Sequence, residues 1–362
     1  MAAQGVDGSV VIEIEADDKG FNRTLNEAEK TAKIAGAAIA ATFTAAEAAI
    51  TKIGEQAVKA FADYEQLVGG IETLFGASGM SLDEYAASVG DSVDNVEERY
   101  NRLISAQTAV MQNANEAYKN AGLSANEYMN TVTGFSASLI ESLGGDTEAA
   151  AKVADMAVTD MADNANKMGT AMESIQNAYQ GFAKGNFTML DNLKLGYGGT
   201  KAEMERLLEK ASELSGLNFD ISNYADVVQA IHIIQDEIGI TGTTQNEAAT
   251  TIQGSISTMK AAWENALTGM ADENQDFNAL IDNLSESILT VANNVIPRFE
   301  AVIPNMANGI GQLADNLLPR IPETVNKVLP ELLTGAEKLI STLLDVIAST
   351  ADTASPIIAE NA

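Results

Sequence analysis

The sequence predicts a mainly α-helical protein, an elongated helical bundle or coiled coil, and three observations lead to this fold class. Proline is absent before Pro297, so long helices can form over most of the chain without a proline break. Apolar residues recur at spacings of three and four, which is the helical period. Aromatic residues make up only 5% of the chain and alanine is plentiful, which suits closely packed helices better than a thick core.

Residues 1–63 are predicted to contain one short strand and one long helix. Val10 to Ile14 alternates apolar and polar side chains, the pattern of a half-buried strand. Asn22 to Asp63 is rich in alanine and has few helix-stopping residues, so it is predicted to be helical. The N-terminus lacks a basic segment followed by an apolar one, so no secretory signal is expected.

Residues 91–121 form the clearest periodic segment, a seam of about four heptads. The seam consists of Val93, Val96, Tyr100, Leu103, Gln107, Val110, Ala114, Ala117 and Ala121. Such a seam belongs either to an amphipathic helix in a bundle or to a coiled coil with a second copy of the chain. In the second case Gln107 would be a polar layer that sets the register. The sequence leaves both interpretations open.

Further helix starts are predicted from capping residues, in which a side chain accepts a hydrogen bond from a free backbone N–H group. Capping boxes are predicted for Ser124 with Glu127, Thr170 with Glu173, Thr200 with Glu203 and Thr244 with Glu247. Asp146 and Ser222 are predicted single caps. Before the third box, Gly196, Gly198 and Gly199 are predicted to form a hinge.

After residue 270 the pattern changes, because all six prolines lie between Pro297 and Pro356. A dipeptide-plus-proline unit recurs as Val295-Ile-Pro297, Val302-Ile-Pro304, Leu317-Leu-Pro319 and Val328-Leu-Pro330. Proline is tolerated in the first turn of a helix, so each unit is predicted to start a short amphipathic helix.

The charge and the missing cysteine limit the classes of function. A net charge of −30 repels a phosphate backbone, so no direct nucleic-acid binding is expected. The same acidity keeps long exposed helices soluble. The chain has no cysteine, which excludes disulfides and thiol chemistry.

Few residues are suited to catalysis. His232 is the only histidine and lies in an apolar segment, so it is predicted to be a packed, hydrogen-bonded side chain. With neither cysteine nor a second histidine, the usual zinc sites cannot form within one chain. Gly196 to Lys201 lacks the residue order of a phosphate loop. We therefore expect no enzyme activity, no catalytic residue, no metal and no cofactor.

Five longer segments carry a family resemblance. They are Tyr64 to Gly76, Leu123 to Asp146, Asn164 to Leu208, Tyr224 to Thr244 and Ile252 to Gly269. Their amino-acid sequences resemble those of the tail tape measure proteins of long-tailed phages and prophages of Gram-positive bacteria. The resemblance covers about residues 60 to 270, which suggests three regions: 1–63, a tape-measure region at 64–270, and 271–362 with the proline units.

The resemblance implies a structural protein that sets tail length. Several copies would form a scaffold inside the tail tube and leave it at genome ejection. The implied partners are other copies of the chain, tail assembly chaperones, and tail tube and distal tail proteins. The implied locations are the lumen of the virion tail and, during assembly, the host cytoplasm. A continuous helix of this length would span at most about 540 Å.

Three alternatives remain open at this point. Members of the family are commonly longer, so the chain could be a truncated prophage remnant. The amphipathic C-terminal segments suggest a membrane-active ejection or pore-forming protein with transient host membrane contact. Against this, only Arg298, Arg320, Lys327 and Lys338 follow Lys260, which weakens attraction to anionic lipids. The weakest alternative is a cell-wall hydrolase, because Glu173-Ser174 resembles the Glu-Ser pair of lytic transglycosylases without their other motifs.

Overall fold

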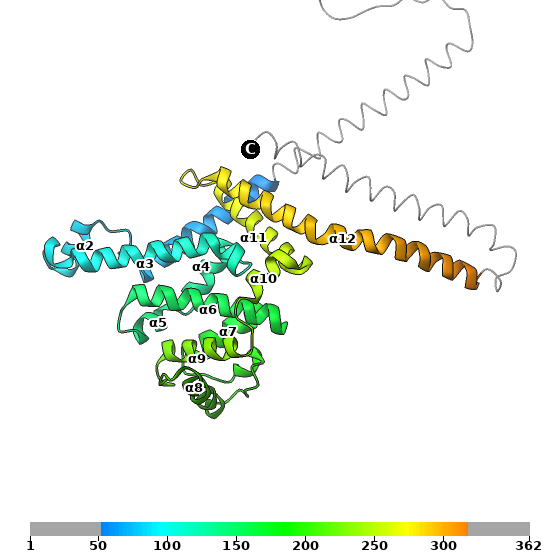
Figure 1. Ribbon diagram of the computed structural model, residues 1–362. Helices are drawn as coiled ribbons and strands as arrows, with labels where there is room; N and C mark the ends of the chain where they lie inside the picture. The colour runs from blue at the N-terminus through cyan, green and yellow to red at the C-terminus, as the bar shows by residue number, and fades with distance from the viewer. Residues whose placement is uncertain (1–51, 318–362) are drawn as a thin grey trace, which may run out of the picture. The chain divides into compact units, whose positions relative to one another are not determined.

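Figure 1 shows the computed structural model, which describes residues 52–317. These residues are mostly helical and contain no strand, so the predicted mainly α class is confirmed for the described part of the chain. The predicted strand at Val10 to Ile14 and most of the predicted helix at Asn22 to Asp63 lie outside the described residues. The proline unit that begins at Val328 also lies outside the described residues. Of the unit that begins at Leu317, only Leu317 itself is described.

The described helices follow one another with short connections. A helix over residues 52–74 is followed by α2 (Leu82–Val89), α3 (Val93–Asn120), α4 (Ala125–Thr133), α5 (Ser136–Ser142), α6 (Thr147–Met168), α7 (Met172–Phe182), the 3-10 helix η1 (Leu190–Leu193), α8 (Lys201–Ser215), α9 (Tyr224–Glu237), α10 (Thr243–Thr250), α11 (Ile252–Met270) and α12 (Phe277–Leu317). Glycine ends several of them. Gly169 after α6 and Gly216 after α8 have φ angles of 64° and 74°, in the left-handed region that favours glycine.

The central element of the fold is α6, which contacts α3, α4, α5, α7, α9 and α10. Ala150, Ala154 and Ala157 are fully buried along it, and their small side chains let the neighbouring helices approach closely. The main core around it combines Ile71, Val110, Met129, Val158, Ile175, Leu207 and Ile231 from seven different helices.

The seam of α3 packs in part against residues of the same chain, and its positions Val93, Tyr100, Leu103 and Gln107 are half-buried. Its first half, which includes Val96 and Tyr100, packs with Tyr85 and Ala86 in a small separate cluster. Its second half, from Val110 to Ala117, packs in the main core. Gln107 lies between the two halves, and its side chain approaches Gly76 so closely that a Cβ atom there would collide with it. Within the described residues, the buried positions of α3 pack against other helices of the same chain.

The two described proline units correct the sequence-based expectation. Pro297 and Pro304 lie inside α12, which continues through both, so neither unit starts a new helix. Proline removes one backbone hydrogen bond from a helix interior. Pro297 and Asn293, four residues earlier, are both exposed, so water can satisfy the carbonyl group that the proline leaves free.

The chain divides into two compact units, Met1–Val291 and Ala292–Ala362, and all sites considered below lie in the first. No helix within residues 52–317 is both long enough and apolar enough to span a membrane.

Candidate functional site

The single histidine lies on α9 and pairs with a buried carboxylate of α6. His232 Nδ1 is 2.9 Å from Asp160 Oδ2 and 3.0 Å from Asp160 Oδ1. The Asp160 side chain is 2% exposed and that of His232 32%. The hydrogen bond to Asp160 raises the pKa of His232 above its usual value. Burial raises the pKa of Asp160, and the hydrogen bond from His232 opposes this effect. The pair fastens α9 to α6.

A second buried carboxylate of α6 caps α10 from a distance. Asp163 is fully buried, and its two carboxylate oxygens accept hydrogen bonds from the backbone N–H groups of Gly242 and Thr244, at 2.6 and 2.7 Å. The predicted capping by Thr244 was wrong, because α10 begins one residue before it, after Gly242, and has no local side-chain cap. The cap comes from a residue 79 positions earlier in the chain than Gly242.

Other buried polar side chains also join helix ends that are distant in sequence. Asn265 Oδ1 on α11 accepts a hydrogen bond of 2.8 Å from the Ala125 N–H at the start of α4. Asn164 Nδ2 on α6 donates one of 2.9 Å to the carbonyl oxygen of Leu193 at the end of η1. These contacts supply partners for backbone groups that a helix leaves free at its ends.

Local capping explains the start of several helices, including α4, α6 and α9. Ser124 and Glu127 make both hydrogen bonds of a capping box at α4, and Asp146 accepts the Ala149 N–H at α6. The α9 cap is Asn223, one residue after the predicted Ser222.

The predicted capping box at Thr170 and Glu173 is absent. Helix α7 has Ala171 as its N-cap residue and no side-chain cap. The Thr170 hydroxyl donates instead to the carbonyl oxygen of Asn192, 3.0 Å away. Glu173 lies exposed in the first turn of α7.

The predicted hinge is a loop that makes several contacts with the start of α8. Thr200 Oγ1 accepts the Glu203 N–H, while Glu203 Oε2 accepts the Gly198 N–H at 3.0 Å instead of completing the box at Thr200. Arg206 donates to the Gly196 carbonyl oxygen at 3.0 Å, pairs with Glu203, and places its guanidinium 4.3 Å from the centre of the Tyr197 ring. These contacts connect Gly196, Tyr197 and Gly198 to α8, and the hinge itself stays a prediction.

Gly199 has a packing role. A Cβ atom at Gly199 would collide with the carbonyl oxygen of Thr188, so only glycine allows the two backbone segments to pass at this distance. At Gly198 the nearest atom to such a Cβ would be Glu203 Cγ at 3.5 Å, an ordinary contact.

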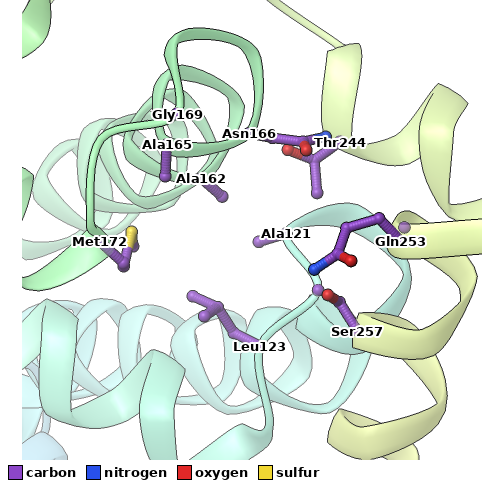
Figure 2. A pocket seen from close by; sticks show the side chains of 12 residues that line it. Ala121, Leu123, Ala162, Ala165, Asn166, Gly169, Met172, Thr244, Gln253 and Ser257 are labelled. Atoms are coloured by element: carbon purple, nitrogen blue, oxygen red, sulfur yellow. The ribbon is translucent and has the colours of Figure 1, made fainter.

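Figure 2 shows a cavity of about 540 Å³ between α3, α6, α7, α10 and α11. Leu123 and Met172 line one side, and Gln253 and Ser257 line the other. Its lining contains no ionisable side chain. The cavity therefore offers contacts to an uncharged group, and it provides neither an acid nor a base for catalysis.

Within residues 52–317 no three histidine, aspartate or glutamate side chains are placed to hold a metal ion. Several polar side chains connect helices or helix ends that are distant in sequence. They are Asp160, Asp163, Asn164, His232 and Asn265. Sequence reasoning missed the roles of Asp163, Asn164 and Asn265, because their partners are 29 to 140 residues away. The only local signal was a polar pair at Asp163 and Asn164 within an apolar helix face.

Neither a protein-family model, nor a curated protein, nor a solved structure matches this chain.

Proposed function

We propose that this chain is a phage tail tape measure protein, a structural scaffold that sets tail length. The observation that carries the proposal is the resemblance of five long segments between residues 60 and 270. Long ordered strings of this kind are more specific than a short motif. The packing supports a structural role, since the buried polar side chains join helix ends instead of converging on a reactive centre.

In this proposal several copies form an elongated bundle in the tail lumen. Assembly chaperones cover the copies in the host cytoplasm until tube subunits polymerise around them, and the bundle is expelled at genome ejection. The acidic surface keeps the long helices soluble before the tube encloses them. Helix α12 illustrates the scale, because its 41 residues rise about 60 Å.

Deleting whole heptads from the predicted N-terminal helix tests the ruler. Removing residues 22–49 takes out 28 residues and leaves the described helix of residues 52–74 intact. That helix is needed for folding, because Ala57 is 3% exposed and the Ala60 carbonyl oxygen accepts a hydrogen bond from Asn126. If each residue spans about 1.5 Å, the tails measured by electron microscopy should be about 42 Å shorter.

The matched control replaces residues 22–49 by an alanine-rich helical sequence of equal length, which should leave tail length unchanged. Tails of normal length with the deletion variant would contradict the ruler. Variable lengths with the equal-length replacement would show that the sequence, and not the length, of this segment matters.

A further inference from the structure

A groove of about 850 Å³ runs along the outer side of α8 and the loop that follows it. Leu208, Leu217, Phe219 and Ile221 supply its apolar part, and Glu205, Glu209, Glu213 and Asp220 supply four carboxylates. No lysine or arginine lines it. Leu217 is 54% exposed, so folding of its own chain removes less than half of its surface from water. A partner that covered this side chain would therefore gain free energy from its burial.

The carboxylates form a ladder along one face of the helix. Glu205, Glu209 and Glu213 are spaced by four residues, so each lies about 6 Å from the next along the helix axis. Like charges at this spacing destabilise a helix. Lys201 lies 3.7 Å from Glu205, and Lys210 lies 3.0 Å from Glu213. Within the described chain the middle residue, Glu209, makes no ion pair.

The loop side of the groove is already shaped without a partner. Asp220 Oδ1 accepts hydrogen bonds of 2.8 Å from both the backbone N–H and the hydroxyl of Ser222. These bonds lower the pKa of Asp220, so it carries its charge at neutral pH. The Asp220 N–H in turn donates to Asp226 Oδ2 at 2.8 Å, which fastens the loop to the first turn of α9.

We propose that this groove binds a cationic amphipathic helix of a partner protein. Lysine or arginine side chains at a spacing of four residues would meet the ladder, and apolar side chains on the same helix would cover Leu217 and Phe219. From Glu205 to Gly216 the face is about 16 Å long, so three turns of a partner helix would fill it. An anionic membrane surface or a nucleic acid would be repelled by the same carboxylates. The proposal does not depend on the tape measure function.

A labelled synthetic peptide tests the groove with the full-length chain. The probe is an amphipathic helix of about 14 residues, with lysines spaced by four on one stripe and leucines beside them. Its binding is measured by fluorescence anisotropy. We expect saturable binding that weakens at least fivefold when salt rises from about 50 to about 300 mM. A peptide of the same composition with lysines spread around the helix should bind at least tenfold more weakly.

Two triple variants with equal charge locate the site. Glu205→Gln, Glu209→Gln and Glu213→Gln together remove three charges from the groove. Glu65→Gln, Glu97→Gln and Glu98→Gln remove three from exposed positions on other helices. We expect the first variant to lose at least tenfold in affinity and the second less than twofold. Circular dichroism confirms that both remain folded.

Leu217→Asn tests the apolar contact separately. Because Leu217 is mostly exposed, the change should not unfold the chain, and it should weaken peptide binding about threefold to tenfold. Equal losses in the two triple variants would overturn the proposal, since they would show a general attraction to an acidic chain. Absence of saturable binding would overturn it too. Neither result bears on tail length, which tests the proposed function.

Discussion

Helices α6 and α8 use polar residues in opposite ways. In α6, half of the 22 residues are buried, and its buried Asp160, Asp163 and Asn164 bind groups on other elements. In α8, the only buried residues are Met204, Leu207, Leu208 and Ala211, and the carboxylates of Glu205, Glu209 and Glu213 are exposed. The difference teaches that an acidic residue here is structural when it is buried against backbone N–H groups, and is available to a partner when it repeats along an exposed face.

The largest effect is expected from removing the α6 carboxylate that caps α10. Asp163→Ala leaves the buried N–H groups of Gly242 and Thr244 without their acceptor, which should cost about 2–4 kcal/mol in the free energy of unfolding. Denaturation followed by circular dichroism measures this. Asp163→Asn keeps one acceptor oxygen and should lose less. If Asp163→Ala lowers the free energy of unfolding no more than Asp163→Asn does, the two hydrogen bonds accepted by Asp163 do not stabilise the start of α10.

Next comes the close backbone contact before α8. Gly199→Ala places a methyl group against the Thr188 carbonyl oxygen and should destabilise the fold by about 1–3 kcal/mol. Gly198→Ala is the matched control, because its methyl group would make an ordinary contact and should change stability by less than about 0.5 kcal/mol. Equal effects in thermal denaturation would show that the loop can move aside, as a hinge would.

The His232–Asp160 pair gives the fold a dependence on pH. The pKa of His232 is raised in the fold, so its contribution is complete below about pH 6.5, the unfolded value, and is lost as pH rises through the folded pKa. His232→Gln should therefore cost about 1 kcal/mol near pH 6, a figure reduced for the partial exposure of the histidine, and less near pH 8. Denaturation at both pH values measures the difference. If the free energy of unfolding lost in His232→Gln does not change with pH, His232 and Asp160 do not form a charged pair.

The smallest effect is expected on the exposed ladder of α8. Glu209→Gln removes a like charge between Glu205 and Glu213, and should raise stability by about 0.2–0.5 kcal/mol. Glu98→Gln on α3 is the contrast, since Glu98 pairs with Arg102 at 3.3 Å and its loss should bring no gain. Differential scanning calorimetry at low salt resolves such a shift. A loss of stability with Glu209→Gln would mean that the ladder is already neutralised within the chain.

The sequence was informative wherever structure depends on neighbouring residues. The helical period, the missing prolines and the local caps at Ser124 and Asp146 depend on contacts within a few residues. They predict the mainly α class and several helix starts. Thr170 and Thr244 carry the same local signal, but tertiary contacts override it: Thr170 bonds to Asn192, and Asp163 accepts the N–H groups of Gly242 and Thr244 at the start of α10.

The contacts around the predicted hinge could not be anticipated for a related reason. A glycine-rich sequence indicates a backbone that can adopt φ and ψ angles that other residues rarely take. It does not indicate which side chains contact that backbone. At Gly196 to Gly199 the fastening side chains, Glu203 and Arg206, lie in the next helix, and Thr188 lies in the segment before. The groove beside α8 was equally invisible, because it forms only when the helix and the following loop fold together.

The cap on α10 also has a consequence for how the chain emerges from the ribosome. Asp163 is synthesised 79 residues before Gly242, and at about 5–20 residues per second this separates them by about 4 to 16 seconds. During that interval the nascent α6 holds a carboxylate that must stay hydrated. We therefore expect the centre of this fold to be completed only after the start of α10 has been translated.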